Sequence, residues 1–311
     1  MNTVDFITQL FLSTVRMATP LLFVAMAELY SERAGLVNIG LDGIMSFGAL
    51  IGFVVGYFTH NPWLGVLAGA CAGVAVNMIY AYCTITLCAE QIVYGMALNI
   101  LAPALASFIY RMTFSDTSSL IEGTVMHPIA IPGLSSIPIL GPIFFNHSLL
   151  VYLAYLFVIF TSIFFSKTKA GLNYKAVGEF PQAAETLGIN VVAKKYLASA
   201  ICGALAGIGG AYLTLCYTSS YSEGIVAGRG FIALSAVIFG RWMPSGVLLA
   251  CLLFGFCDAA QIRLQIMSPQ TPYQLLQMIP YVFTLLALIV FGIKKSGPRA
   301  NGQPYFRENR A

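Results

Sequence analysis

Apolar residues run along this chain in long windows that short polar segments separate. A helix needs about 20 apolar residues to cross the hydrocarbon core of a membrane. Windows 43–58 and 231–243 are shorter than this, which predicts broken or re-entrant helices. The pattern predicts an all-α, polytopic membrane protein that forms one transmembrane domain over residues 1–311 and has about nine spans. These are 6–28, 43–58, 63–88, 92–111, 148–165, 196–217, 231–243, 246–260 and 274–292.

The largest polar interruption, residues 166–195, contains five lysines and a further helical signal. Pro181 suits the first turn of a helix and Gly188 suits its end, so a short helix is expected across 180–188. A short helix between two membrane spans, beside several lysines, is suited to docking a cytoplasmic protein. Its basic flanks would also hold it at an anionic lipid surface.

The charges predict how the chain is oriented. Only 9% of residues are charged and 58% are hydrophobic, whereas soluble domains carry about 25% charged residues. Of the sixteen Lys and Arg residues, five lie in 167–195 and five in 294–310. Cytoplasmic segments attract such residues, so loop 166–195 and tail 293–311 should be cytoplasmic. The long loop 112–147 has no Lys or Arg and should be extracellular, as should the N-terminus. Arg111, Arg229 and Arg263 should then lie at the outer side. The net charge of +4 then reflects topology and gives no sign of nucleic-acid binding.

Glycines recur at every fourth position in two neighbouring windows. Such spacing places small residues on one helix face, where it allows two helix backbones to approach closely in lipid. The connection between these windows is short, so they are expected to be antiparallel neighbours, and a Gly/Ala-rich run at 203–211 repeats the pattern. The glycines are Gly48, Gly52, Gly56, Gly65, Gly69 and Gly73.

Residues 28–43 are polar and glycine-rich although apolar windows flank them. They fit either an ordinary cytoplasmic loop, with Glu28 and Arg33 at the interface, or a re-entrant segment that borders a transport pathway. Residues 224–240 have a spacing of glycine and apolar residues similar to that of 35–52. The two segments are predicted to cross the membrane in opposite directions, as in inverted-repeat transporters. The candidate substrate-path residues are Asn38, Asp42, Asn99 and Phe231. Asp258 is expected to pair with Arg263 at the outer end of a span.

The motifs of soluble and intramembrane enzymes are missing from the sequence. It has no GxxxxGK[ST] loop for ATP, no HExxH and no GxSxG, so we assign it no catalytic residue, no metal ligand and no cofactor. All seven cysteines fall in apolar windows and none forms a CxxC pair, which favours a role as small buried side chains.

Two stretches resemble the permeases of bacterial ABC importers. Residues 31–45, SERAGLVNIGLDGIM, are similar to the ERAGxxNxGxEG signature of the ribose and branched-chain amino-acid class, closest to its nucleoside-uptake branch. Residues 176–190, AVGEFPQAAETLGIN, resemble the cytoplasmic coupling segment GENPxAAxxxGI, and 228–242 is also similar to that branch. The chain departs from these patterns at Asp42, where Glu is usual, and at Phe180, where Asn is usual.

The resemblance implies a nucleoside importer in the bacterial inner membrane, coupled to its motor through the helix at 180–188. It implies a cytoplasmic ATPase subunit that binds ATP and Mg²⁺, a second and paralogous permease, and an extracellular solute-binding protein or lipoprotein. Alternatives are import of simple sugars or branched-chain amino acids, a stand-alone secondary transporter, or a scaffold without transport. The implied ATPase-coupling residues are Glu179, Phe180, Pro181, Ala183, Ala184, Glu185, Leu187 and Gly188.

Overall fold

The long helices of the chain coincide with its apolar windows. A computed structural model describes residues 3–114, 121–130, 140–267 and 297–306, together with 275–276, 278, 282 and 286. Within these residues, seven helices are long and apolar enough to cross a membrane, and an eighth apolar helix is shorter. The predicted span 274–292 lies mostly outside the described residues. The prediction of an all-α polytopic fold is confirmed.

The seven long helices are α1 (Thr3–Arg33), α2 (Leu41–Thr59), α3 (Pro62–Ala81), α4 (Gln91–Thr113), α6 (Leu149–Lys167), α9 (Val191–Tyr212) and α11 (Pro244–Met267). The shorter helices are α5 (Leu140–Phe145), α7 (Lys169–Glu179), α8 (Pro181–Thr186) and α10 (Arg229–Phe239). Single π-helical turns, η1 (Tyr82–Thr86) and η2 (Leu213–Tyr217), extend α3 and α9. Strands β1 (Ile129–Ala130) and β2 (Asn146–His147) form an antiparallel pair within the predicted loop 112–147.

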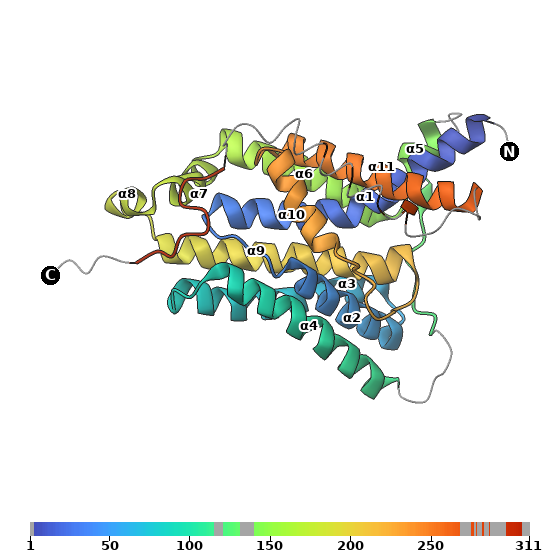
Figure 1. The fold of residues 1–311 in the computed structure, drawn as a ribbon, viewed down its shortest axis with the longest axis horizontal. Helices are drawn as coiled ribbons and strands as arrows, with labels where there is room; N and C mark the ends of the chain where they lie inside the picture. The colour runs from blue at the N-terminus through green and yellow to red at the C-terminus, as the bar shows by residue number, and fades with distance from the viewer. Residues whose placement is uncertain are drawn as a thin grey trace.

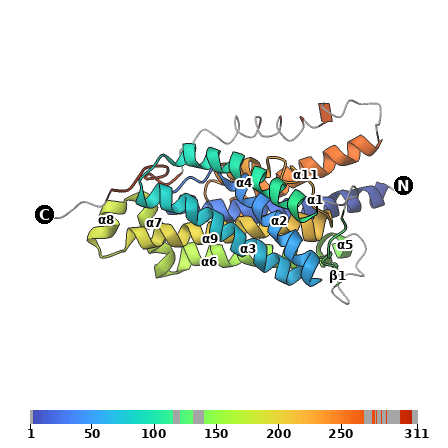
Figure 2. The same ribbon diagram turned by 90° about the horizontal axis from the view of Figure 1, so that it is seen from below.

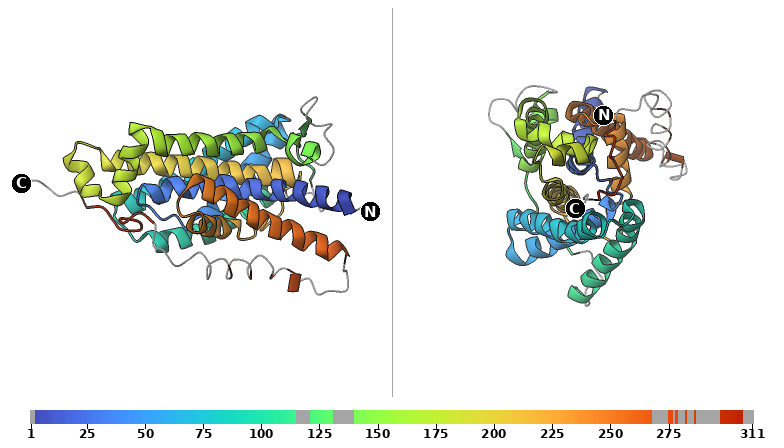
Figure 3. Two further views of the ribbon diagram at one scale, coloured as in Figure 1. Left: turned by 90° about the horizontal axis from the view of Figure 1, so that it is seen from above. Right: turned by 90° about the vertical axis from the view of Figure 1, so that its left-hand side faces the viewer.

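The long helices run side by side along the long axis of the molecule (Figure 1). The N-terminus, α5 and β1 lie at one end, and α7 and α8 lie at the other (Figures 1 and 2). Helix α4 stands at the edge of the bundle, on the opposite side from α6 (Figures 1 and 3). The bundle therefore has two distinct ends, and the predicted docking helix is at the end remote from the N-terminus.

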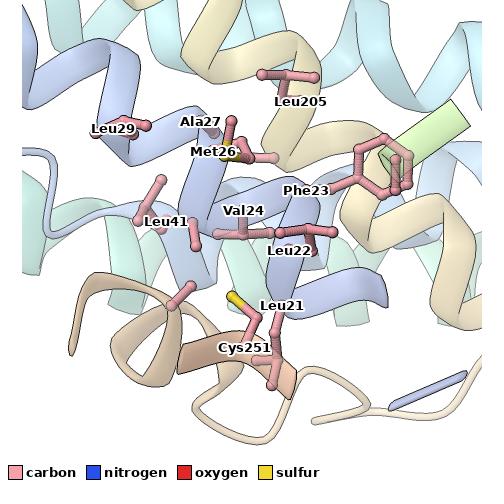
Figure 4. Packing of buried hydrophobic residues seen from close by; sticks show 14 of the residues in the cluster. Leu21, Leu22, Phe23, Val24, Met26, Ala27, Leu29, Leu41, Leu205 and Cys251 are labelled. Carbon is pink, nitrogen blue, oxygen red and sulfur yellow. The ribbon is translucent and has the colours of Figure 1, made fainter. Parts of the chain in front are cut away.

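Helix α1 forms the centre of the bundle and packs against α9, α10 and α11. Its residues Leu21, Leu22 and Val24 are at most 1% exposed, and Figure 4 shows Leu21 beside Cys251 of α11. Interiors of this kind are packed as densely as organic crystals, so α1 is a fixed element against which shorter helices can be positioned.

Helices α2, α3 and α9 contact one another through glycine. A Cβ atom on Gly73 would lie 2.2 Å from the carbonyl oxygen of Gly203, and one on Gly207 would lie 2.2 Å from that of Gly69. A Cβ atom on Gly48 would lie 2.6 Å from Gly207. The pairing order makes α3 antiparallel to α9 and α2 parallel to it. The predicted close packing through four-residue glycine spacing is confirmed.

The two short apolar windows have different structures. Helix α10 has 11 residues, a length of about 16 Å, which is too short for a hydrocarbon core of about 30 Å. The prediction of a broken element is confirmed there. Window 43–58 instead forms α2, an unbroken helix of 19 residues. The interruption lies just before it, in the non-helical residues 34–40.

Candidate functional site

The non-helical segment 34–40 is buried and anchored by side chains. A carboxylate oxygen of Glu28 accepts the N–H of Asn38 at 2.9 Å, and Gln91 Oε1 accepts that of Val37 at 2.8 Å. The Tyr80 hydroxyl donates to the Val37 carbonyl at 2.6 Å. Irregular backbone at membrane depth requires such partners. Glu28 is 0% exposed, so protein encloses this carboxylate, which favours the re-entrant interpretation of the segment.

Two predicted path residues hold this segment in place. Asn38 is 0% exposed and donates from Nδ2 to Asn77 Oδ1 at 2.8 Å. Asn99, from α4, accepts the N–H of Gly43 at 2.8 Å and donates to the carbonyl of Ile39 at 2.7 Å. Both side chains therefore bond to the protein around the start of α2, and Asn99 joins α4 to that start.

The N-termini of α2 and α10 meet inside the bundle. Asp42 Oδ1 accepts the N–H of Gly230 at 2.9 Å, and a Cβ atom on Gly230 would lie 2.4 Å from the Asp42 nitrogen. From this contact α2 runs to Phe53, whose ring lies 6.3 Å from that of Tyr221. Helix α10 runs the other way, and the indole N–H of Trp242 just beyond it donates to Glu32. The predicted opposed arrangement of 35–52 and 224–240 is confirmed.

Asp42, Arg229 and Asp258 form what we call the central polar cluster. Arg229 interacts electrostatically with both carboxylates and donates to the carbonyl oxygen of Ile225 at 3.0 Å. Two helix N-termini add partial positive charge beside Asp42. Phe231, in the first turn of α10, is 45% exposed. The cluster thus combines two carboxylates and a guanidinium, and Phe231 follows two residues after Arg229 in the first turn of α10.

The structure corrects two sequence-based expectations at this cluster. Arg229 was expected at the outer side, but Gly230 beside it contacts the start of α2. Asp258 was expected to pair with Arg263, whereas its electrostatic partner is Arg229. Arg263 instead donates to Gln9 Oε1 at 3.5 Å. Local spacing could predict neither the contact of Gly230 with the start of α2 nor the interaction of Arg229 with Asp258, because the partners are distant in sequence.

The predicted docking helix is present as α8, between Phe180 and Gly188. Pro181 occupies its first turn, and Gly188 follows it with φ +80, in the left-handed region that favours glycine. Leu187 is 81% exposed and Phe180 is 53% exposed. The end of the molecule therefore presents two large apolar side chains next to a six-residue helix.

The other predicted coupling residues divide between the surface and the interior. Ala183 and Gly188 are exposed, whereas Pro181 is buried. Ala184 is 2% exposed and packs with Val177, Val191 and Tyr305. Ala184 thus holds α8 on the body of the protein. Glu179 and Glu185 bond to the described C-terminal residues, Glu185 accepting from the Tyr305 hydroxyl.

The surroundings of two charged groups outside the spans shift their pKa values. Hydrogen bonds from Arg111, at the end of α4, lower the pKa of Glu223, and the two side chains are 2.7 Å apart. At the opposite end, burial and then the positive charge of Arg33 lower the pKa of Lys175. The first pair ties α4 to the segment that leads into α10.

The comparisons with known proteins identify the family. Residues 10–291 match the family described as branched-chain amino acid transport system / permease component. The chain belongs to this family. It is 38% identical to the nucleoside ABC transporter permease protein NupC of Lactococcus lactis subsp. cremoris (strain MG1363), over 99% of each chain. It is 35% identical to the guanosine ABC transporter permease protein NupQ of Bacillus subtilis (strain 168), over 100% of each.

A third relative and a solved structure extend this picture. TsgC13 of Haloferax volcanii, which carries the provisional name of a glucose ABC transporter permease, is 35% identical over 95% of this chain and 97% of its own. The fold is similar to the inward-facing structure of an ABC transporter assigned to the metal-chelate type, with TM-score 0.50 and 16% identity. That match covers 91% of this chain and 82% of the other.

The permease is thus the multi-pass membrane subunit of an ABC transporter. Permease subunits of these transporters are not themselves enzymes. They work with an ATPase partner and with other subunits such as a binding protein. The resemblance drawn from residues 31–45 and 176–190 is confirmed at the level of family and subunit.

Proposed function

We propose that this permease imports nucleosides across the bacterial inner membrane. The observation that carries the proposal is the full-length similarity to NupC and NupQ, which are named for nucleoside and guanosine transport. The central polar cluster supports it, because two carboxylates and a guanidinium can hydrogen-bond ribose hydroxyls and base edges, while Phe231 offers an aromatic face.

The free energy for transport would come from ATP hydrolysis in a separate subunit. In this proposal a cytoplasmic ATPase holds ATP and Mg²⁺, and this chain binds no cofactor of its own. The ATPase receives α8, whose exposed Leu187 and Phe180 provide an apolar contact surface. Chain 1–311 acts as one transmembrane domain, with its N-terminus and loop 112–147 outside the cell. Loop 166–195 and tail 293–311 are then in the cytoplasm.

The remaining partners would complete the pathway. An extracellular solute-binding protein or lipoprotein delivers the solute, and a second, paralogous permease faces this one across the path. Only 17% of the apolar window of α4 is buried, less than in any other described span. This leaves α4 to be covered by membrane lipid and the second permease. Asn99 on α4 and Asn38 would then position the path, and Asp42 and Phe231 would line it.

The substrate prediction is tested by uptake. Cells that lack the gene are expected to lose uptake of labelled guanosine, and a plasmid copy of this chain should restore it. Labelled glucose, ribose and leucine are measured in the same cells. Unchanged guanosine uptake together with lost sugar uptake would reject the nucleoside proposal and favour a sugar importer, for which TsgC13 is the specific precedent.

The docking prediction concerns Leu187. Leu187→Asp should release the ATPase subunit from the purified complex, because a charge replaces an 81% exposed leucine at the proposed contact. Leu172→Asp is the matched control, since Leu172 is 67% exposed but lies on α7. Co-purification and ATP-dependent uptake are measured for both. A wild-type permease that purifies alone and still transports would support a stand-alone transporter instead.

A further inference from the structure

The described C-terminal residues, 297–306, return to the body of the permease at the end that carries α8. In Figure 1 this red segment lies between α7 and the start of α9. Ala300 and Tyr305 are 7% and 8% exposed. The N–H of Ala300 donates to the carbonyl of Gly178 at 2.9 Å. Its own carbonyl oxygen would lie 3.2 Å from a Cβ atom on Gly35. We call residues 297–306 the tail segment.

One set of contacts joins the tail segment to the docking helix. The guanidinium of Arg299 lies 5.1 Å from the centre of the Phe180 ring, a cation–π geometry. The Tyr305 hydroxyl donates to Glu185 of α8. On its other side the Tyr305 ring lies 5.8 Å from Nζ of Lys195, on α9. Tyr305 therefore fills the space between α8 and the first turns of α9.

A second set joins the same segment to the inner end of the re-entrant elements. Asn301 Nδ2 donates to Glu32 Oε2 at 3.1 Å, and that oxygen also accepts the indole N–H of Trp242. A Cβ atom on Gly297 would lie 2.9 Å from the Trp242 ring. Arg33 donates to the Trp242 carbonyl at 3.1 Å. Trp242 is in the turn between α10 and α11, so the tail segment contacts that turn directly.

We propose that Arg299, Asn301 and Tyr305 are positioning residues for energy coupling. The inference rests on the proposed docking of the ATPase at α8. Helix α8 has only six residues, and the tail segment links it through few bonds to Glu32, to Trp242 and to the segment that precedes α2. Displacement of α8 then moves the α10–α11 turn and the start of α2 together. The two opposed helix N-termini at Asp42 and Gly230 are reached by this route.

Tyr305→Phe and Asn301→Ala test the two ends of the link in the complete transporter. Tyr305→Phe removes only the hydroxyl that donates to Glu185, and Asn301→Ala removes the donor to Glu32. Gln303→Ala, whose side chain is exposed, is the control. The wild type and each variant are purified with the ATPase subunit that accompanies the wild type and are reconstituted in proteoliposomes with the binding protein. Guanosine uptake, ATP hydrolysis, bound ATPase and permease yield are all measured.

Uptake per ATP hydrolysed is expected to fall about tenfold in each test variant, the effect of losing one hydrogen bond to a charged group. Bound ATPase and permease yield should match the control. Glu185→Gln should change uptake less in the Tyr305→Phe background than in the wild type, since both alter one bond. If uptake per ATP hydrolysed is the same in the test variants as in the wild type, the inference is overturned. It is also overturned if a loss of bound ATPase or of permease yield accounts for the lost uptake. If the wild type binds no ATPase, the docking proposal itself fails.

Discussion

Replacing Asp42 by alanine is expected to reduce solute uptake about tenfold or more while the permease still assembles. The Asp42 carboxylate accepts the N–H of Gly230 at 2.9 Å and interacts electrostatically with Arg229. A hydrogen bond to a charged group contributes about 1.5–3 kcal/mol, and each 1.4 kcal/mol corresponds to a factor of ten. Because this bond joins the starts of α2 and α10, its loss should disturb the proposed path while the glycine contacts of the bundle remain.

Two further variants at this position separate charge from hydrogen bonding. Asp42→Asn keeps an oxygen acceptor for Gly230 but removes the charge beside Arg229, so an intermediate loss of uptake is expected. Asp42→Glu keeps the charge and should retain most uptake. Glu122→Ala, which removes an exposed carboxylate, serves as the control. Uptake is normalised to the amount of permease in the membrane. Wild-type uptake by Asp42→Ala would show that the contact between α2 and α10 is dispensable for transport.

The spans and their glycine contact surfaces could be predicted because they follow from repeating local patterns. A window of about 20 apolar residues has few stable structures in lipid other than a helix. Glycines four residues apart lie on one helix face, so Gly65, Gly69 and Gly73 indicated a contact surface before any partner was known. Pro181 and Gly188 indicated α8 for the same reason, since each marks one end of a helix by its backbone geometry.

The candidate site was predicted only in part, because its contacts join distant residues. Asp42 and Gly230 are 188 positions apart, and Glu185 and Tyr305 are 120 apart. No local spacing reports such pairs. The sequence therefore identified Asp42 as a polar residue in an apolar region, but it placed Arg229 at the outer side and paired Asp258 with Arg263.

The sequence also could not predict which side chains of residues 180–188 point to the surface and which point to the interior. Ala183 and Ala184 are neighbours in the motif and were both assigned to coupling, yet Ala183 is exposed and Ala184 is buried against Tyr305. Phe180 replaces a residue that would cap α8, and its ring instead receives the guanidinium of Arg299. Which neighbour covers each side of a six-residue helix depends on tertiary packing, which the helix signals at Pro181 and Gly188 do not specify.

Replacing Gly73 by leucine is expected to prevent the permease from accumulating in folded form. A Cβ atom at this position would lie 2.2 Å from the Gly203 carbonyl oxygen and 2.9 Å from Cα of Gly207. Both are backbone atoms of α9, so the clash cannot be relieved by rotating a side chain. Overpacking typically costs about 1–3 kcal/mol and occasionally more, and a leucine here would force α3 and α9 apart along their shared face.

Ala75→Leu is the matched control, because Ala75 lies two residues further along α3 and is exposed. The amount of monodisperse permease after detergent extraction and its thermal unfolding midpoint are measured for both variants. Gly73→Ala should fall between Ala75→Leu and Gly73→Leu, since it adds only the first clashing atom. Equal yield and equal midpoints for the two leucine variants would contradict the close approach of α3 and α9. The same result would also contradict the position of α2, because its Gly48 packs against Gly69 of α3 and Gly207 of α9.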